Sequence, residues 1–99
     1  MKYRFDGLAE FMSRRGRVML LQLVLDSGMT QNEVAVYLSV TQQAVSKWLN
    51  PRETHPCNKN LRRLLKLAWE ISPRGSLEVL KHEHDTFSEL FRSFANSKH

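Results

Sequence analysis

Two helix-capping signals stand close together near the middle of the chain, and they restrict its fold more than any other feature. Thr30 and Glu33 have the spacing of a capping box, in which the hydroxyl accepts from a backbone N–H and the glutamate reaches back to the cap. Thr41, eleven positions after Thr30, is a second residue of the type that favours N-caps. Because each cap begins a helix, the sequence predicts two short helices here, over Gln31–Leu38 and Gln42–Leu49.

Each of these two predicted helices has one apolar face. Val34 and Leu38 form it in the first helix, and Val45 and Trp48 form it in the second. A small residue, Ala35, stands where the second helix would cross the first. Two short helices joined by a turn of a few residues have the spacing of a helix-turn-helix. The other face of the second helix is polar and short enough to enter a DNA groove, with Thr41, Gln42, Gln43, Ser46 and Lys47.

Helical periodicity also dominates the segments on either side. Apolar spacing predicts a helix over about Gly7–Asp26, with Gly16 as a potential interruption and Gly28 as the stop. Asn60 is predicted to cap a further helix over Leu61–Ile71.

The last segment is predicted to begin at Ser76, after a break at Ser72–Gly75. Its apolar residues follow alternating steps of three and four, an a/d pattern with a histidine in one a position. A helix accounts for this spacing, and a short strand over Leu77–Lys81 is the alternative. The predicted class is therefore all-α, a bundle of about five helices with a C-terminal amphipathic helix. The residues of the pattern are Leu77, Leu80, His84, Phe87, Phe91 and Phe94.

The positive charge of the chain is concentrated in one stretch. The formal net charge is +5, and residues 41–66 contain six basic side chains against one acidic side chain. Such clustering suits a surface that faces phosphates better than one that only keeps the protein in solution. It favours a polyanionic partner for the second predicted short helix and the segment after it.

Several classes of protein are not indicated by the sequence. No apolar run approaches the roughly 20 residues that span a bilayer, and the first residues lack a signal-peptide layout. The single cysteine, Cys57, cannot form an intrachain disulfide, which fits a reducing cytoplasm. The pairs His55–Cys57 and His82–His84 offer too few ligands for zinc, and no catalytic motif stands out. We expect a cytoplasmic protein that is not an enzyme and has no metal, cofactor or membrane partner.

The stretch MTQNEVAVYLSVTQQAVSKWLN, residues 29–50, resembles the helix-turn-helix of the phage lambda-type repressor and Cro superfamily. The loop that follows and residues 61–68 resemble the next helix of that fold, so the resemblance covers roughly residues 15–72. It departs at Ser39, where the family usually has glycine in the turn. The resemblance implies a lambda-repressor-like helix-turn-helix bundle. The matching residues are Thr30, Gln31, Ala35, Leu38, Val40, Val45 and Trp48.

The resemblance also implies roles for single residues in binding double-stranded DNA. Glutamine pairs with adenine and lysine reaches guanine in the major groove, whereas phosphate contacts position the protein without reading sequence. The residues implied for base contacts are Gln42, Gln43, Ser46 and Lys47. Those implied for phosphate contacts are Gln31, Thr41, Arg52, Lys59, Arg62 and Arg63. The roles of Arg14, Arg15 and Arg17 stay open between phosphate contacts and a solvated face.

The expected organisation is a DNA-binding domain over residues 1–74 and a C-terminal helix within 75–99. Dimerisation is the favoured role of this helix, because a dimer reads two half-sites about 34 Å apart; packing of its phenylalanines on the core is the alternative. The residues assigned to dimerisation are Leu77, Leu80, Phe87, Phe91 and Phe94. The favoured function is a homodimeric transcriptional repressor on a pseudo-palindromic operator.

Three other functions remain open at this point. The first is an antitoxin of a toxin–antitoxin pair, whose C-terminal helix would bind a toxin. The second is a DNA architectural or recombination-directionality factor. An enzyme or metal-binding module ranks last.

Overall fold

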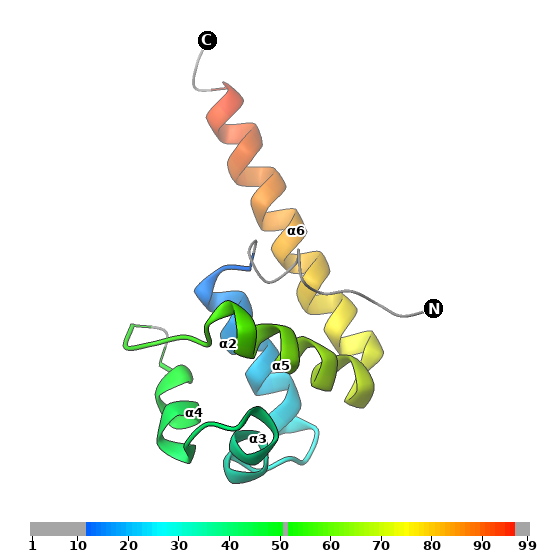
Figure 1. Cartoon of the computed structure of the whole chain (residues 1–99). Helices are drawn as coiled ribbons and strands as arrows, with labels where there is room; N and C mark the ends of the chain where they lie inside the picture. Colours follow the sequence, from blue (N-terminus) through cyan, green and yellow to red (C-terminus); the bar gives the residue numbers. More distant parts are fainter. Residues whose placement is uncertain (1–11, 51, 97–99) are drawn as a thin grey trace.

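The computed structural model describes residues 12–50 and 52–96, and these residues form five α-helices and no strand (Figure 1). The all-α class predicted from the sequence is confirmed. None of the described helices is both long and apolar enough to cross a membrane. The helices are α2 (Arg14–Asp26), α3 (Gln31–Leu38), α4 (Gln42–Trp48), α5 (Asn58–Ile71) and α6 (Pro73–Asn96).

The core is a single cluster to which every described helix contributes. Helices α2 and α5 pack against each other, α3 and α4 cover one end, and the first half of α6 lies against both α2 and α5. The apolar spacing of three and four residues places each contribution on one side of its helix. The buried side chains include Leu20, Leu21 and Val24 of α2, Val34, Ala35 and Leu38 of α3, Val45 and Trp48 of α4, Leu61, Leu64, Leu65 and Ala68 of α5, and Val79 of α6.

The turn between α3 and α4 has a left-handed residue where the sequence has serine in place of glycine. Ser39 has φ 58° and ψ 43°. The N–H of Val40 donates to the carbonyl of Ala35 at 2.9 Å, which closes the end of α3 in the manner of a Schellman motif. The left-handed residue reverses the chain within a few positions, so α4 can begin at Gln42.

Four predicted helix boundaries are corrected by the structure. The first described helix begins at Arg14, capped by Ser13, and it continues through Gly16 without a break; residues 7–11 of the predicted helix lie outside the described residues. Helix α4 ends at Trp48, with Leu49 as its C-cap.

Helix α5 begins at Asn58, not after Asn60, because the N–H of Leu61 already donates to the carbonyl of Cys57 at 2.8 Å.

Helix α6 begins at Pro73, within the segment Ser72–Gly75 where the sequence predicted a break before a helix from Ser76. Only Ser72 separates it from α5, and Pro73 is its first residue, a position where the missing proline N–H costs nothing. The Ser72 hydroxyl accepts from the N–H of Gly75 at 3.2 Å. The alternative strand over residues 77–81 is wrong, and the expected domain division after residue 74 falls within the first turn of α6.

A carboxylate from α6 caps the first helix of the bundle. Glu83 Oε1 accepts hydrogen bonds from the backbone N–H of Ser13 at 2.7 Å and from its hydroxyl at 2.9 Å. A Cβ added at Gly16 would collide with this carboxyl group, so the glycine leaves the space in which Glu83 sits. The negative charge also suits the N-terminal end of the α2 dipole. This contact fixes the middle of α6 against the start of α2.

We expect the effect of Gly16→Ala on stability to depend on Glu83. In a Glu83→Ala background the alanine should stabilise the protein by about 1 kcal/mol, since alanine is the better helix former. With Glu83 present, the new methyl group displaces the carboxylate. The loss of its contact with the start of α2 should lower the free energy of unfolding by about 1 kcal/mol, which cancels the gain from alanine. Urea unfolding of the two single variants, the double variant and the parent measures this coupling. An equal gain in both backgrounds would contradict it.

Candidate nucleic-acid interface

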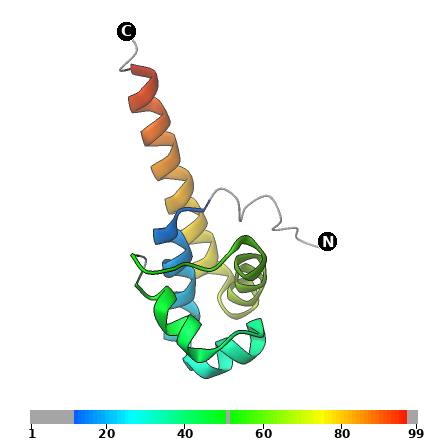
Figure 2. The ribbon, with the colours of Figure 1, turned by 60° about the vertical axis from the view of Figure 1, so that its left-hand side comes forward.

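Helix α4 separates its residues cleanly between the core and solvent. Val45 and Trp48 are buried, and the residues between them point outward. The four residues predicted for base contacts, Gln42, Gln43, Ser46 and Lys47, are all exposed. In both views α4 lies beside α3, at the end of the bundle away from the tip of α6 (Figure 2). The structure thus gathers the predicted set on one outward face.

Side-chain caps fix the start of α3 and of α4. The capping box forms as predicted: the N–H of Glu33 donates to Thr30 Oγ1 at 3.1 Å, and the N–H of Thr30 donates to Glu33 Oε1 at 3.0 Å. The hydrogen bond from the Thr30 N–H, and then that from its hydroxyl, lowers the pKa of Glu33 below its ordinary value. At α4, Thr41 Oγ1 accepts from the N–H of Ala44 at 3.1 Å. Both short helices therefore begin at defined residues.

A shallow hollow adjoins the exposed face of α4. Its wall comes from three segments: α4 itself, the loop between α4 and α5, and the first turn of α5. Polar side chains line most of it, and the ring of Trp48 contributes an apolar wall. The lining residues are Thr41, Gln43, Ala44, Lys47, Trp48, Thr54, His55, Cys57 and Asn60.

The loop after α4 is held from behind by Arg17 of α2. This side chain is only 7% exposed. Its Nη1 donates to the carbonyl of Pro56 at 2.6 Å, its Nη2 to Asn58 Oδ1 at 3.0 Å and its Nε to the carbonyl of Met12 at 3.1 Å. A single guanidinium thus joins α2, the loop and the first residue of α5.

Arg17 therefore has neither of the roles that the sequence left open for it. Burial lowers the pKa of its guanidinium from its ordinary value, while the charges of Cys57 and Glu83 act in the opposite direction. It stays protonated at physiological pH. The overlooked signal is its position, because Arg17, Leu20, Leu21 and Val24 follow the spacing of the buried face of α2. Its neighbours Arg14 and Arg15 are exposed.

The residues predicted for phosphate contacts come from α3, the N-cap of α4, the loop after α4, and α5. Gln31, the first residue of α3, and Arg62 of α5 are half-buried. Arg52 of the loop and Lys59 in the first turn of α5 are exposed. Thr41 is exposed, and its hydroxyl already serves as the cap of α4.

Arg63 has an internal contact that the sequence did not reveal. Its guanidinium donates to the carbonyl of Tyr37 at 2.7 Å and to that of Leu38 at 3.4 Å, and it lies 5.6 Å from the centre of the Tyr37 ring. A cation at the last carbonyls of a helix is favourable for its dipole. Arg63 thus joins the end of α3 to α5, which positions the turn before α4.

The histidine and cysteine pairs do not gather into a larger cluster. His55 and Cys57 both line the hollow beside α4, and His84 lies 3.6 Å from Asp85 on α6. Among the described residues, no three His, Cys, Asp or Glu side chains come together in a way that could hold a metal ion.

Comparison of the chain with protein-family models, with curated proteins and with solved structures gives no match.

We expect Arg17→Met to destabilise the fold by about 1–3 kcal/mol, because it removes the donors for two buried carbonyls. Arg14→Met is the matched control: it lies on the exposed side of the same helix, and its effect should stay within about 0.5 kcal/mol. Urea unfolding followed by circular dichroism measures both. Equal effects of the two substitutions would show that the buried guanidinium does not hold the loop.

Proposed function

We propose that this protein is a sequence-specific regulator of transcription that binds double-stranded DNA. In this proposal α3 and α4 are the helix-turn-helix of a lambda-repressor-like bundle, and α4 is its recognition helix. The observation that carries the proposal is the division of α4, which buries Val45 and Trp48 and exposes a row of polar side chains. A helix of this kind fits the major groove, which is about 12 Å wide.

The exposed side chains of α4 have the chemistry for reading base edges. Gln42 and Gln43 can pair with adenine through both N6 and N7, and Lys47 can reach O6 and N7 of guanine. Ser46 can contact several bases through its hydroxyl. Each good contact of this kind discriminates against a wrong base by about 1–3 kcal/mol. The caps at Thr30 and Thr41 support this role, because they fix the helix that carries the side chains.

The surrounding basic residues supply the contacts that do not depend on sequence. Lys59 and Arg52 are exposed in the segment that follows α4, and both are within the stretch that contains six basic residues and one acidic residue. We assign them, with Gln31 and Arg62, to the phosphates that flank the bases. We assign Arg63 to positioning, because its guanidinium already bonds the end of α3.

A bundle of this kind regulates by occupancy. Its presence on a promoter excludes polymerase from the same duplex, so we propose repression, in the cytoplasm where the thiol of Cys57 stays reduced. The proposal is for a binding protein, not an enzyme.

Selection of bound sequences from a random duplex pool tests this proposal. With purified protein at near-physiological salt, we expect enrichment of one sequence motif. Binding without enrichment, which disappears as salt rises, would contradict sequence-specific recognition and leave only attraction between a basic protein and a polyanion.

Two alanine substitutions should separate reading from positioning. Gln43→Ala should relax the preference at one base pair and leave the salt dependence of binding unchanged. Lys59→Ala should weaken binding to specific and random DNA alike and lower the salt slope by about one. Both side chains are exposed, so the fold should tolerate either change. The same loss of specificity from both variants would contradict the assigned roles.

A further inference from the structure

Helix α6 leaves the bundle halfway along its length. Its first half packs on α2 and α5, where Ser76 and Val79 are buried and Leu80 is half-buried against the core. Glu83 accepts hydrogen bonds from Ser13, the N-cap residue of α2. Beyond that point α6 projects away from the bundle (Figures 1 and 2).

The projecting half exposes four large apolar side chains. Phe87, Leu90, Phe91 and Phe94 are 60%, 67%, 64% and 58% exposed. At about 100° of rotation per residue they continue the line of the residues that dock the first half on the bundle. One apolar stripe thus runs along the whole helix, and only its first half is covered by the bundle. We call these four residues the distal stripe.

The residues around the distal stripe are sorted by charge. The charged side chains of the projecting half lie on the side of the helix opposite the stripe, as helical spacing places Asp85, Glu89 and Arg92. The two borders of the stripe have small or neutral residues, which let another helix approach closely. These border residues are His84, Thr86, Ser88, Ser93 and Ala95.

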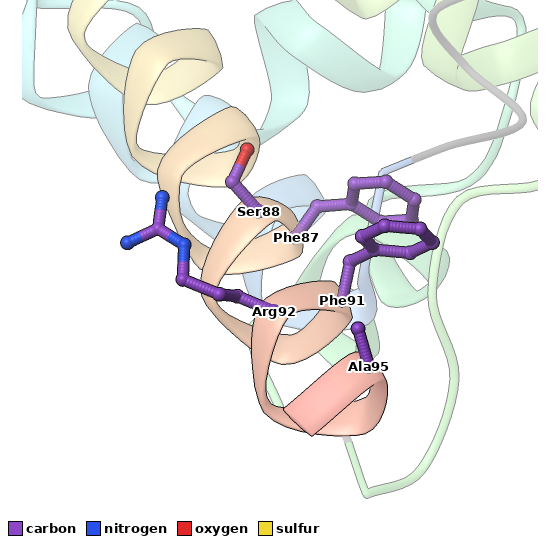
Figure 3. A pocket seen from close by; sticks show the side chains of 5 residues that line it. All are labelled: Phe87, Ser88, Phe91, Arg92 and Ala95. Atoms are coloured by element: carbon purple, nitrogen blue, oxygen red, sulfur yellow. The ribbon is translucent and has the colours of Figure 1, made fainter. Parts of the chain in front are cut away.

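A shallow hollow lies on one border of the distal stripe. It is lined by Phe87, Ser88, Phe91, Arg92 and Ala95 (Figure 3). Four of these residues, Ser88, Phe91, Arg92 and Ala95, stand at positions i, i+3, i+4 and i+7. The hollow therefore runs along the side of α6, between the distal stripe and the charged side to which Arg92 belongs. Figure 3 shows the side chains of Phe87 and Phe91 leaving the helix on one side and that of Arg92 on another.

We propose that a second copy of this chain covers the distal stripe. At roughly 200 Å² for a large aromatic side chain, the four residues expose about 500 Å² in each copy. Pairing would bury about 1,000 Å² in total, which reaches the lower limit for a specific interface. A stripe without charge suits its own copy, since a two-fold axis places the same surface on both sides of the contact.

The bundle allows the second helix to approach in one direction. The bundle of each copy lies on the same side of α6 as the distal stripe. A partner helix that ran parallel to α6 would therefore place its own bundle in the space that the first bundle occupies. An antiparallel helix places that bundle beyond the free end of α6. With the two-fold axis between Leu90 and Phe91, Leu90 of one copy faces Phe91 of the other, and Phe87 faces Phe94. All four side chains then have apolar partners.

The a/d pattern of the sequence assigned a different set of residues to dimerisation, and the proposed pairing changes that set in two ways. Leu80 packs on the core of its own chain, and Leu77, although exposed, lies to one side of the line of the distal stripe. Leu90 joins the set instead. The consequence for DNA rests on the proposed function: α4 lies at the end of the bundle away from the tip of α6, so antiparallel pairing places the two α4 helices at opposite ends of the dimer, where each would bind its own site.

The mass of the full chain in solution, without DNA, tests the pairing directly. Sedimentation equilibrium at micromolar concentration should give twice the mass of one chain for the parent. Phe91→Asp should weaken the dimer about a hundredfold, because two carboxylates would enter an apolar contact. Asn96→Asp is the matched control, since it places the same charge on the opposite side of the same helix, and it should leave the dimer intact.

Each outcome bears on one proposal only. A parent protein of single mass would overturn the pairing, and so would a Phe91→Asp variant that remains dimeric. Phe91 is exposed, so circular dichroism should show unchanged helix content for the variant. A dimer that enriches no DNA sequence would leave the pairing in place and overturn the proposed function. A monomer that enriches one DNA motif would leave the proposed function in place and overturn the pairing.

Discussion

The buried guanidinium of Arg17 is the interaction on which the arrangement of the helices around α4 depends. It bonds the carbonyl of Met12, the carbonyl of Pro56 and the side chain of Asn58, which belong to three different segments. A buried charge is costly unless its donors are satisfied, and here each donor group has an oxygen acceptor. The loop behind α4 is thereby fixed without a regular element of its own, and α5 begins at the residue that Arg17 binds.

A second arginine, Arg63, holds the segment that precedes α4, as Arg17 holds the loop that follows it. Arg63 of α5 bonds the last carbonyls of α3, and the left-handed Ser39 then turns the chain into α4. Helix α4 has only seven residues, too few to be stable alone in water. Its shape is set by a cap at one end, by Val45 and Trp48 beneath it, and by arginine-held segments on both sides. The proposed recognition surface needs this kind of support, because side chains on a frayed helix would not keep one spacing.

The sequence predicted the features that depend on neighbouring residues. The caps at Thr30 and Thr41 and the buried faces of α3 and α4 are local signals, so both helices are found where they were expected. The features it missed depend on contacts between distant segments. The first residue of α5, Asn58, is bonded to Arg17 of α2, and Arg63 bonds a helix 25 residues earlier in the chain. No periodicity records these contacts, although a charged residue on an apolar face, as at Arg17, is a sign that one exists.

Helix α6 shows why an apolar pattern alone does not give the identity of its partner. The spacing of its phenylalanines predicted an amphipathic helix, and one continuous stripe does run along it. The bundle covers the part of that stripe before Glu83, and the four residues beyond it stay exposed. The Glu83 cap therefore does two things at once: it completes α2 and it fixes where the covered half of α6 ends. Loss of this contact would weaken the hold of α6 on the start of α2. The start of α2 and the surface proposed to pair two copies are thus joined through one carboxylate.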